Sequence, residues 1–187
     1  MKSKHTLAAF FTAAIVVLSL SATAQAHGHK GHMAASPEGV ALETPYAGQE
    51  KRAIKTLSAR DIDDLENGRG WGFAKAAELN GLPGPRHLLD MGDEIGLTAE
   101  QTAAIGNLFT AMKDQAIPLG KRLVALEGAL NAAFAERAID EARLMAMLGE
   151  IGKLRSELRF VHLATHLKTP ALLSALQIED YNRLRGY

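Results

Sequence analysis

The sequence contains no cysteine, and this absence excludes several kinds of chemistry at once. A chain without thiols has no disulfide framework, no thiolate metal ligand and no thiol nucleophile. Aromatic residues make up only 5% of the chain, so its core must be mainly aliphatic. No stretch alternates polar and apolar residues or concentrates β-branched ones, as β-strands would. The composition therefore predicts an all-α protein that is stabilised by packing alone.

The charges are balanced, with 21 basic and 21 acidic residues. Proteins that hold nucleic acid through bulk charge carry a basic excess, so we expect no nucleic-acid partner. Gly68, Gly70 and Gly72 follow no predicted strand, unlike a phosphate-binding loop. No paired carboxylates and no Ser/His/Asp arrangement are brought together by their spacing. We therefore do not expect an enzyme.

The first 26 residues have the parts of a secretory signal peptide. Lys2 and Lys4 precede an apolar run over residues 7–20, and residues 24–26 (Ala-Gln-Ala) supply a cleavage site. The run is short for a bilayer span of about 20 residues, which argues against an uncleaved anchor. We expect export to the periplasm, and a mature chain that begins at His27 and does not span the membrane.

The start of the mature chain is rich in histidine. His27, His29 and His32 lie within six residues, separated by flexible glycines. If cleavage follows Ala26, the free amine, two backbone amides and the His29 imidazole can form a square-planar nitrogen site, which suits Cu(II) or Ni(II). The alternative is a solvated polar tail without a metal role. Residues 27–57 are therefore expected to be a histidine-rich tail followed by an irregular arm.

Residues 58–96 form a segment of short helices. Ser58 and Gly96 carry a start and a stop signal, and Trp71, the only tryptophan, is predicted to anchor this segment. The expected helices cover residues 58–68, 73–80 and 86–95.

Residues 97–187 are predicted to form a long antiparallel helical hairpin followed by a short helix. The first long helix begins at Thr98, with Gln101 placed to complete a capping box. The second begins after Asp140, and a tight connection joins the two helices. One apolar stripe follows each helix at spacings of three and four: Ile105, Leu108, Met112, Ala116, Leu119, Leu123, Leu126, Leu130 and Ala133, then Leu144, Met147, Ile151, Leu154, Leu158 and Val161.

Pro118 lies inside the first long helix, where a proline removes one backbone hydrogen bond and predicts a bend. A helix over residues 99–136 would span about 55 Å. A bent rod of that length favours a curved, shallow shape in which the hairpins of two chains pack together.

His162 and His166 lie four residues apart, on one face of the second long helix. This spacing can chelate one ion of zinc, copper or nickel. The alternative is that His162 flanks the apolar seam and His166 is solvated. No glutamate follows His162, so the pair does not match a metalloprotease motif.

The opening signal of the first long helix recurs near the end of the chain. The pattern Leu-Thr/Ser-x-x-Gln occurs twice, at Leu97, Thr98 and Gln101 and again at Leu173, Ser174 and Gln177. This pair of motifs around a helical hairpin, behind a signal peptide, resembles the Spy/CpxP-like periplasmic superfamily, which includes ZraP-like and CnrX-like heavy-metal proteins. The resemblance covers residues 86–187, but its second motif has serine for threonine.

The resemblance implies an all-helical, cradle-like homodimer in the periplasm. It also implies one of two activities: ATP-independent chaperone action on unfolded envelope proteins, or heavy-metal sensing or buffering, with a membrane stress sensor as a further possible partner. For the chaperone, the sequence suggests a client-binding set of basic residues, although the same residues also suit a solvated helix face: Lys121, Arg122, Lys153, Arg155 and Arg159.

Overall fold

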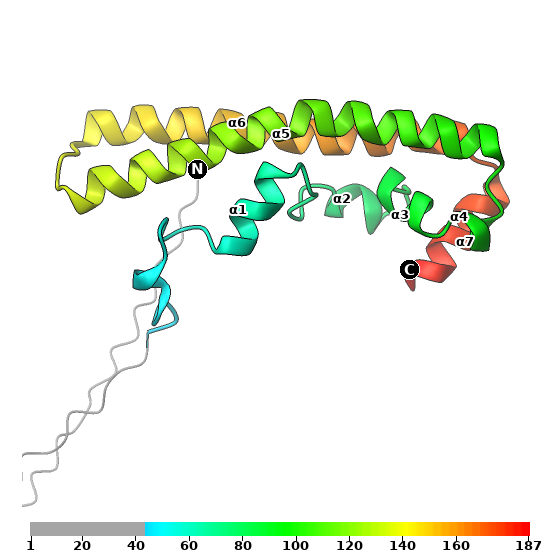
Figure 1. The fold of residues 1–187 in the computed structure, drawn as a ribbon, viewed down its shortest axis with the longest axis horizontal. Coiled ribbons are helices and arrows are strands. Elements are labelled where there is room, and N and C mark those ends of the chain that lie inside the picture. The colour runs from blue at the N-terminus through cyan, green and yellow to red at the C-terminus, as the bar shows by residue number, and fades with distance from the viewer. Residues whose placement is uncertain (1–43) are drawn as a thin grey trace, which may run out of the picture. The chain divides into compact units, whose positions relative to one another are not determined.

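A computed structural model describes residues 44–187, which form one compact unit. The described residues form helices and no strand, which confirms the all-α prediction. The two longest helices, α5 (Ala99–Ala135) and α6 (Glu141–Lys168), pack side by side as an antiparallel hairpin (Figure 1). Shorter helices flank this hairpin along one side and near its base, which is the end where α5 begins and α6 ends.

The long helices begin where the sequence predicts. The Thr98 hydroxyl accepts the backbone N–H of Gln101, and the Gln101 side chain accepts the backbone N–H of Thr98, which completes the capping box. The Asp140 carboxylate accepts the backbone N–H of Arg143 at the start of α6. Arg137, with a φ of 54°, makes the sharp turn between the helices. A left-handed residue at this point lets the hairpin close in few residues.

Helix α5 continues through Pro118 as one helix. Its two halves nevertheless run in different directions (Figure 1), which agrees with the bend that the proline predicts. The bend lies beside α1 (Ala59–Glu66), where Gly120 approaches the Leu65 backbone.

The short helices differ from the prediction in two places. The helix expected over residues 73–80 is limited to α2 (Lys75–Glu78). The helix expected over residues 86–95 is divided into α3 (Pro85–Asp90) and α4 (Gly92–Ile95), because Met91 leaves helical geometry with φ −115° and ψ 23°. A glycine after Met91 weakens helix continuity by about 1 kcal/mol relative to alanine, and the prediction, which rests on the stop signal at Gly96, takes no account of this cost.

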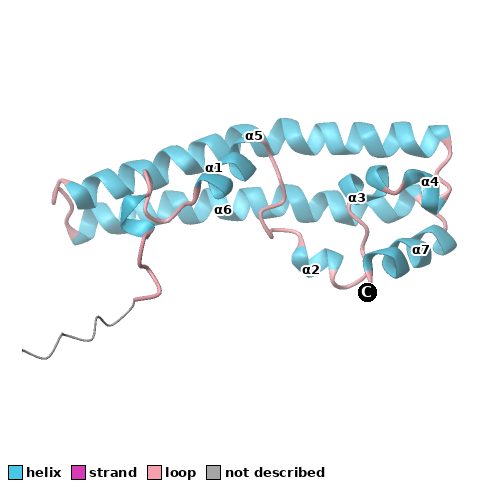
Figure 2. Cartoon of the chain, turned by 60° about the horizontal axis from the view of Figure 1, so that its bottom comes forward, coloured by secondary structure: helices cyan, strands magenta, loops and turns pink. Residues whose placement is uncertain are grey.

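Helix α6 ends at Lys168 and is followed by a 3₁₀ turn, Thr169–Leu172, which contains Pro170. Helix α7 (Ala175–Arg185) comes next and lies near α4 at the base of the hairpin (Figure 2). Its N-terminus is capped by Ser174 and Gln177 in the same way as that of α5. The predicted final helix is therefore confirmed.

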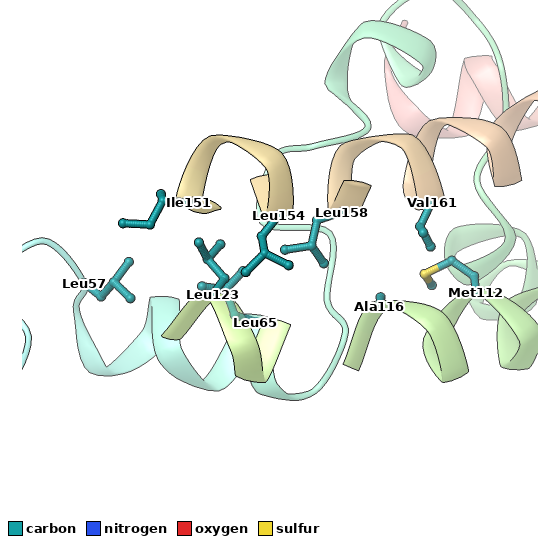
Figure 3. Close-up of a cluster of buried hydrophobic side chains, with 9 residues drawn as sticks. All are labelled: Leu57, Leu65, Met112, Ala116, Leu123, Ile151, Leu154, Leu158 and Val161. Atoms are coloured by element: carbon teal, nitrogen blue, oxygen red, sulfur yellow. The ribbon is translucent and has the colours of Figure 1, made fainter. Parts of the chain in front are cut away.

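Helices α1 to α4 lie along one side of the hairpin (Figure 1). We call this side the covered face. Leu57 and Leu65 insert there between the stripes of α5 and α6 (Figure 3). The members of this main core are Leu57, Leu65, Met112, Ala116, Leu123, Ile151, Leu154, Leu158 and Val161. A second, smaller core at the base joins Leu88, Ile95, Ile105 and Tyr181. Most of the predicted stripe residues thus lie in the core or against it, and residues before the hairpin complete it. Leu108, Leu144 and Met147 are the exceptions, because they are only partly buried and belong to neither core.

Candidate functional site

The predicted signal peptide and the histidines of the tail, His27, His29 and His32, lie outside the described residues. Among residues 44–187, no helix combines the length and the apolar character needed to cross a membrane.

The other predicted metal ligands, His162 and His166, are both buried in α6, with exposed fractions of 5% and 7%. The expectation that His166 is solvated is therefore wrong. The loop between α2 and α3 passes over it, and the His166 Nδ1–H donates to the Leu82 carbonyl at 2.9 Å. Gly84 makes this approach possible, because a Cβ there would lie 2.6 Å from His166 Cε1. The α6 sequence contains no signal of this long-range cover.

His162 stacks on Phe73, with ring centroids 5.8 Å apart. Its Nε2 is buried and has no hydrogen-bond partner among the described residues. Burial, and secondly the nearby His166, lower the pKa of His162 to about 4, so the imidazole is neutral at physiological pH. The described residues contain no group of three or more His, Cys, Asp or Glu side chains placed to hold a metal ion. Within this part of the chain the two imidazoles stand as a pair, short of a closed site.

A cavity of about 430 Å³ adjoins the two histidines. It lies where α5 and α6 meet the loops after α1 and before α3. Its lining combines apolar, basic and imidazole side chains, among them Arg86, Phe109, Met112, Lys113, His162 and His166. Sequence periodicity identified Met112 as a core residue, but the loops that close the cavity could not be placed from sequence.

Glu78 lines this cavity and connects α2 to the last residues of the chain. Its Oε1 accepts from the Arg185 guanidinium at 2.5 Å and from the Tyr187 hydroxyl at 3.0 Å. Burial opposes ionisation of Glu78, but these hydrogen bonds outweigh it and lower the pKa of the carboxyl below its usual value. The negative charge of Glu78 is therefore already satisfied within the protein.

The two motif glutamines pair with each other. The Gln101 Nε2 donates to Gln177 Oε1, and the Gln177 Nε2 donates to Gln101 Oε1, both at 2.9 Å. The same amides reach the backbone carbonyls of Leu172 and Gly96. We call this arrangement the glutamine clasp. The predicted caps are confirmed, and the structure adds that the two motifs bind each other and join the starts of α5 and α7.

The outer side of α6 bears large apolar side chains that no described residue covers. Met145, Phe160 and Leu167 are 72%, 70% and 71% exposed. Their positions place them on one side of the helix, with small residues between them. We call this surface the open stripe; it comprises Met145, Gly149, Gly152, Ser156, Phe160 and Leu167.

A groove of about 520 Å³ borders the middle of the open stripe. Trp71, Phe73, Arg155 and Arg159 line it, together with Gly72 and Ser156. The Trp71 Nε1–H donates to Asp61 at 2.8 Å, which fixes the indole in place. This bond and the larger contribution from the Ser58 hydroxyl lower the pKa of Asp61. The groove therefore combines a fixed aromatic wall with two cations.

The five basic residues predicted to bind clients divide into two groups. Arg155 and Arg159 line the groove, and the Arg155 guanidinium lies 5.0 Å from the Trp71 ring centroid and 3.5 Å from buried Glu127. Lys121, Arg122 and Lys153 are exposed and do not line it. The aromatic residues beside the arginines were missed, because Trp71 and Phe73 are remote in sequence.

Comparison of the chain with protein-family models, with characterised proteins and with solved structures gave no match.

Proposed function

We propose that this protein is a non-enzymatic, ATP-independent periplasmic chaperone that holds unfolded envelope proteins on the open stripe of α6 and in the adjoining groove. The observation that carries this proposal is the exposure of Met145, Phe160 and Leu167 on one side of a single helix. Exposed apolar side chains grouped in this way mark interaction surfaces more often than isolated ones do.

The chemistry of the surface suits clients without a fixed fold. Methionine and small residues adapt to many shapes, and a guanidinium beside an indole can bind aromatic or acidic side chains. Arg155 is held near Trp71 by the cation–π contact and by Glu127, while Arg159 is exposed. The surface offers many weak contacts, as a chaperone that releases its clients without nucleotide requires.

The proposal places the clients differently from an open cradle. In the described unit, one side of the hairpin already holds α1 to α4, and Leu57 and Leu65 occupy its core. The outer side of α6 is therefore the surface on which we place the client. A homodimer belongs to the proposal through the family resemblance, and the mass of the native protein in solution tests it.

The test is suppression of the aggregation of a denatured client at a near-stoichiometric ratio. We expect suppression by the unaltered protein and its loss in the double variant Met145→Ser and Phe160→Ser. Leu176→Ser is the matched control, because Leu176 is also 72% exposed but lies on α7. Absence of suppression by the unaltered protein, with and without added metal, would contradict the proposal.

The alternative proposal is a periplasmic metal sensor or buffer for copper, nickel or zinc. Its support is the histidine-rich start of the predicted mature chain, because the described residues contain no group of three or more His, Cys, Asp or Glu side chains placed to hold a metal ion. Calorimetric titration with Cu(II), Ni(II) and Zn(II) tests it on the mature protein and on a variant with His27, His29 and His32 changed to alanine. Equal isotherms for the two proteins would show that His27, His29 and His32 do not contribute to metal binding.

A further inference from the structure

The cavity beside His162 and His166 is separate from the open stripe, and the chaperone proposal does not use it. Its volume of about 430 Å³ lies in the range of pockets that hold small organic molecules. Phe109 and Met112 give it an apolar wall, and Arg86 and Lys113 add positive charge. Elements that are far apart in the sequence converge on it, so its form depends on the complete fold.

The cavity lining contains one buried polar atom that the described residues leave without a hydrogen-bond partner. His162 is 5% exposed, and its Nε2 has no hydrogen bond, which is a costly arrangement for a buried polar atom. The Leu82 carbonyl can only accept, so His166 donates to it through its Nδ1–H. A hydroxyl group on the body of a bound molecule would supply the missing donor.

The uncompensated charge around the cavity is positive. Glu78 is the acidic residue of the lining, and Arg185 and Tyr187 already satisfy it. Arg86 pairs with Asp90 at the rim. Lys113 is half-buried and makes no ion pair with a described residue; its Nζ lies 5.9 Å from the centroid of the Phe109 ring. An anion would therefore find a partner here, whereas a cation would be repelled.

We propose that this cavity is a binding site for a small organic acid with an apolar body, whose carboxylate pairs with Lys113 and whose apolar part lies against Phe109 and Met112 near the two imidazoles. The ligand class follows from the unpaired cation, the apolar wall and the unpartnered Nε2 of His162. The chaperone surface plays no part in this binding, so either proposal can fail without the other.

The experiment is an NMR titration that follows the methionine methyl signals of the purified full chain. The acid probes are 4-hydroxybenzoate and hexanoate, and their neutral amides, 4-hydroxybenzamide and hexanamide, are matched in shape. We expect at least one acid to shift the Met112 methyl signal and to bind about tenfold or more tightly than its amide, since the amide lacks the ionic hydrogen bond. Met145, which lies on the open stripe, should not shift.

Two pairs of variants locate the site. Lys113→Met should weaken binding of the acid about tenfold, whereas Lys121→Met, on the exposed surface of the same helix, should not. Gly84→Ala places a Cβ against His166 and should weaken binding by displacing the ring. Gly70→Ala is its control, because Gly70 also lines the cavity but has nothing within 4 Å of its Cβ position.

Three results would overturn the proposal. The first is that neither acid shifts Met112, or that acid and amide bind equally. The second is that Lys113→Met binds the acid as the unaltered protein does. The third is that Zn(II) alone shifts Met112 while the acids do not, which would assign the cavity to a metal ion held by the imidazoles.

Discussion

On the covered face of the hairpin, Gly120 lies so close to α1 that a Cβ would be 2.0 Å from the Leu65 carbonyl oxygen. On the outer side of α6, Gly149 and Gly152 have nothing within 4 Å of the corresponding position. Both sides carry apolar and small residues at helical spacing. The comparison teaches that composition alone does not distinguish a packed surface from one that is open to a partner.

The difference between the two faces arises outside the hairpin. Residues 44–98 supply the layer that covers one face, through Leu57, Leu65 and the Thr56 hydroxyl, which donates to Glu127 at 2.9 Å. No described residue does the same for the open stripe. The covered face therefore accounts for stability, and the open stripe is available for binding.

The largest effect that can test this comparison is expected at Gly120. Gly120→Ala should lower the free energy of unfolding by about 3 kcal/mol, because α1 must move away from α5. Gly152→Ala should raise it by about 0.5–1 kcal/mol, since alanine favours a helix where space is free. Denaturant unfolding measures both. Equal losses in the two variants would show that both faces are packed.

The second largest change in stability is expected on the covered face when the pH is lowered. Because the pKa of His162 in the folded protein is about 4, below the ordinary value of 6.5, the unfolded chain binds the proton more readily. The stability associated with neutral His162 is therefore complete above pH 6.5 and is lost as the pH falls towards 4, by about 2–3 kcal/mol.

Unfolding measured between pH 7 and 4 tests this expectation, with His162→Gln as the comparison, because glutamine does not titrate. The slope of the unfolding free energy against pH over this range should be smaller in the variant. The contributions of Asp61 and Glu78, whose pKa values are lowered, are instead lost below their ordinary range. An unchanged slope in His162→Gln would show that another group causes the acid sensitivity.

A smaller effect is expected at the base of the hairpin. Gln101→Ala should cost about 1–2 kcal/mol, since it removes one half of the glutamine clasp and one half of a capping box. Gln115→Ala is the control, because its side chain only donates to Ala111 within the same helix. Thermal unfolding should separate the two variants; if they unfold alike, the clasp does not contribute to stability.

The smallest effect on stability is expected on the open stripe. Phe160→Ser should change the free energy of unfolding by less than about 0.5 kcal/mol, as is usual for an exposed position. Leu158→Ala, two residues earlier and 1% exposed, should cost about 3 kcal/mol. Denaturant unfolding compares them. A large loss in Phe160→Ser would mean that this side chain is buried in solution, as in a homodimer.

The sequence predicts local features of this fold well. Thr98, Asp140 and Ser174 begin their helices as expected, because capping depends on residues within one turn. The stripe of α6 is also predicted correctly at Ile151, Leu154 and Leu158. The sequence does not predict which segments cover that stripe, why His166 is buried, or that Arg155 lies against Trp71. These features depend on loops that return from distant parts of the chain, and helical periodicity contains no information about them.

The glutamine clasp has a consequence for the order of folding. It joins residues that are 76 positions apart, whereas the contacts at the turn of the hairpin are local. Contacts between residues far apart in the sequence carry a larger loop-closure entropy cost than local ones, and this cost falls once the intervening helices have formed. Helix α7 should therefore dock late and leave early, so that a weakened clasp accelerates unfolding and leaves the refolding rate almost unchanged.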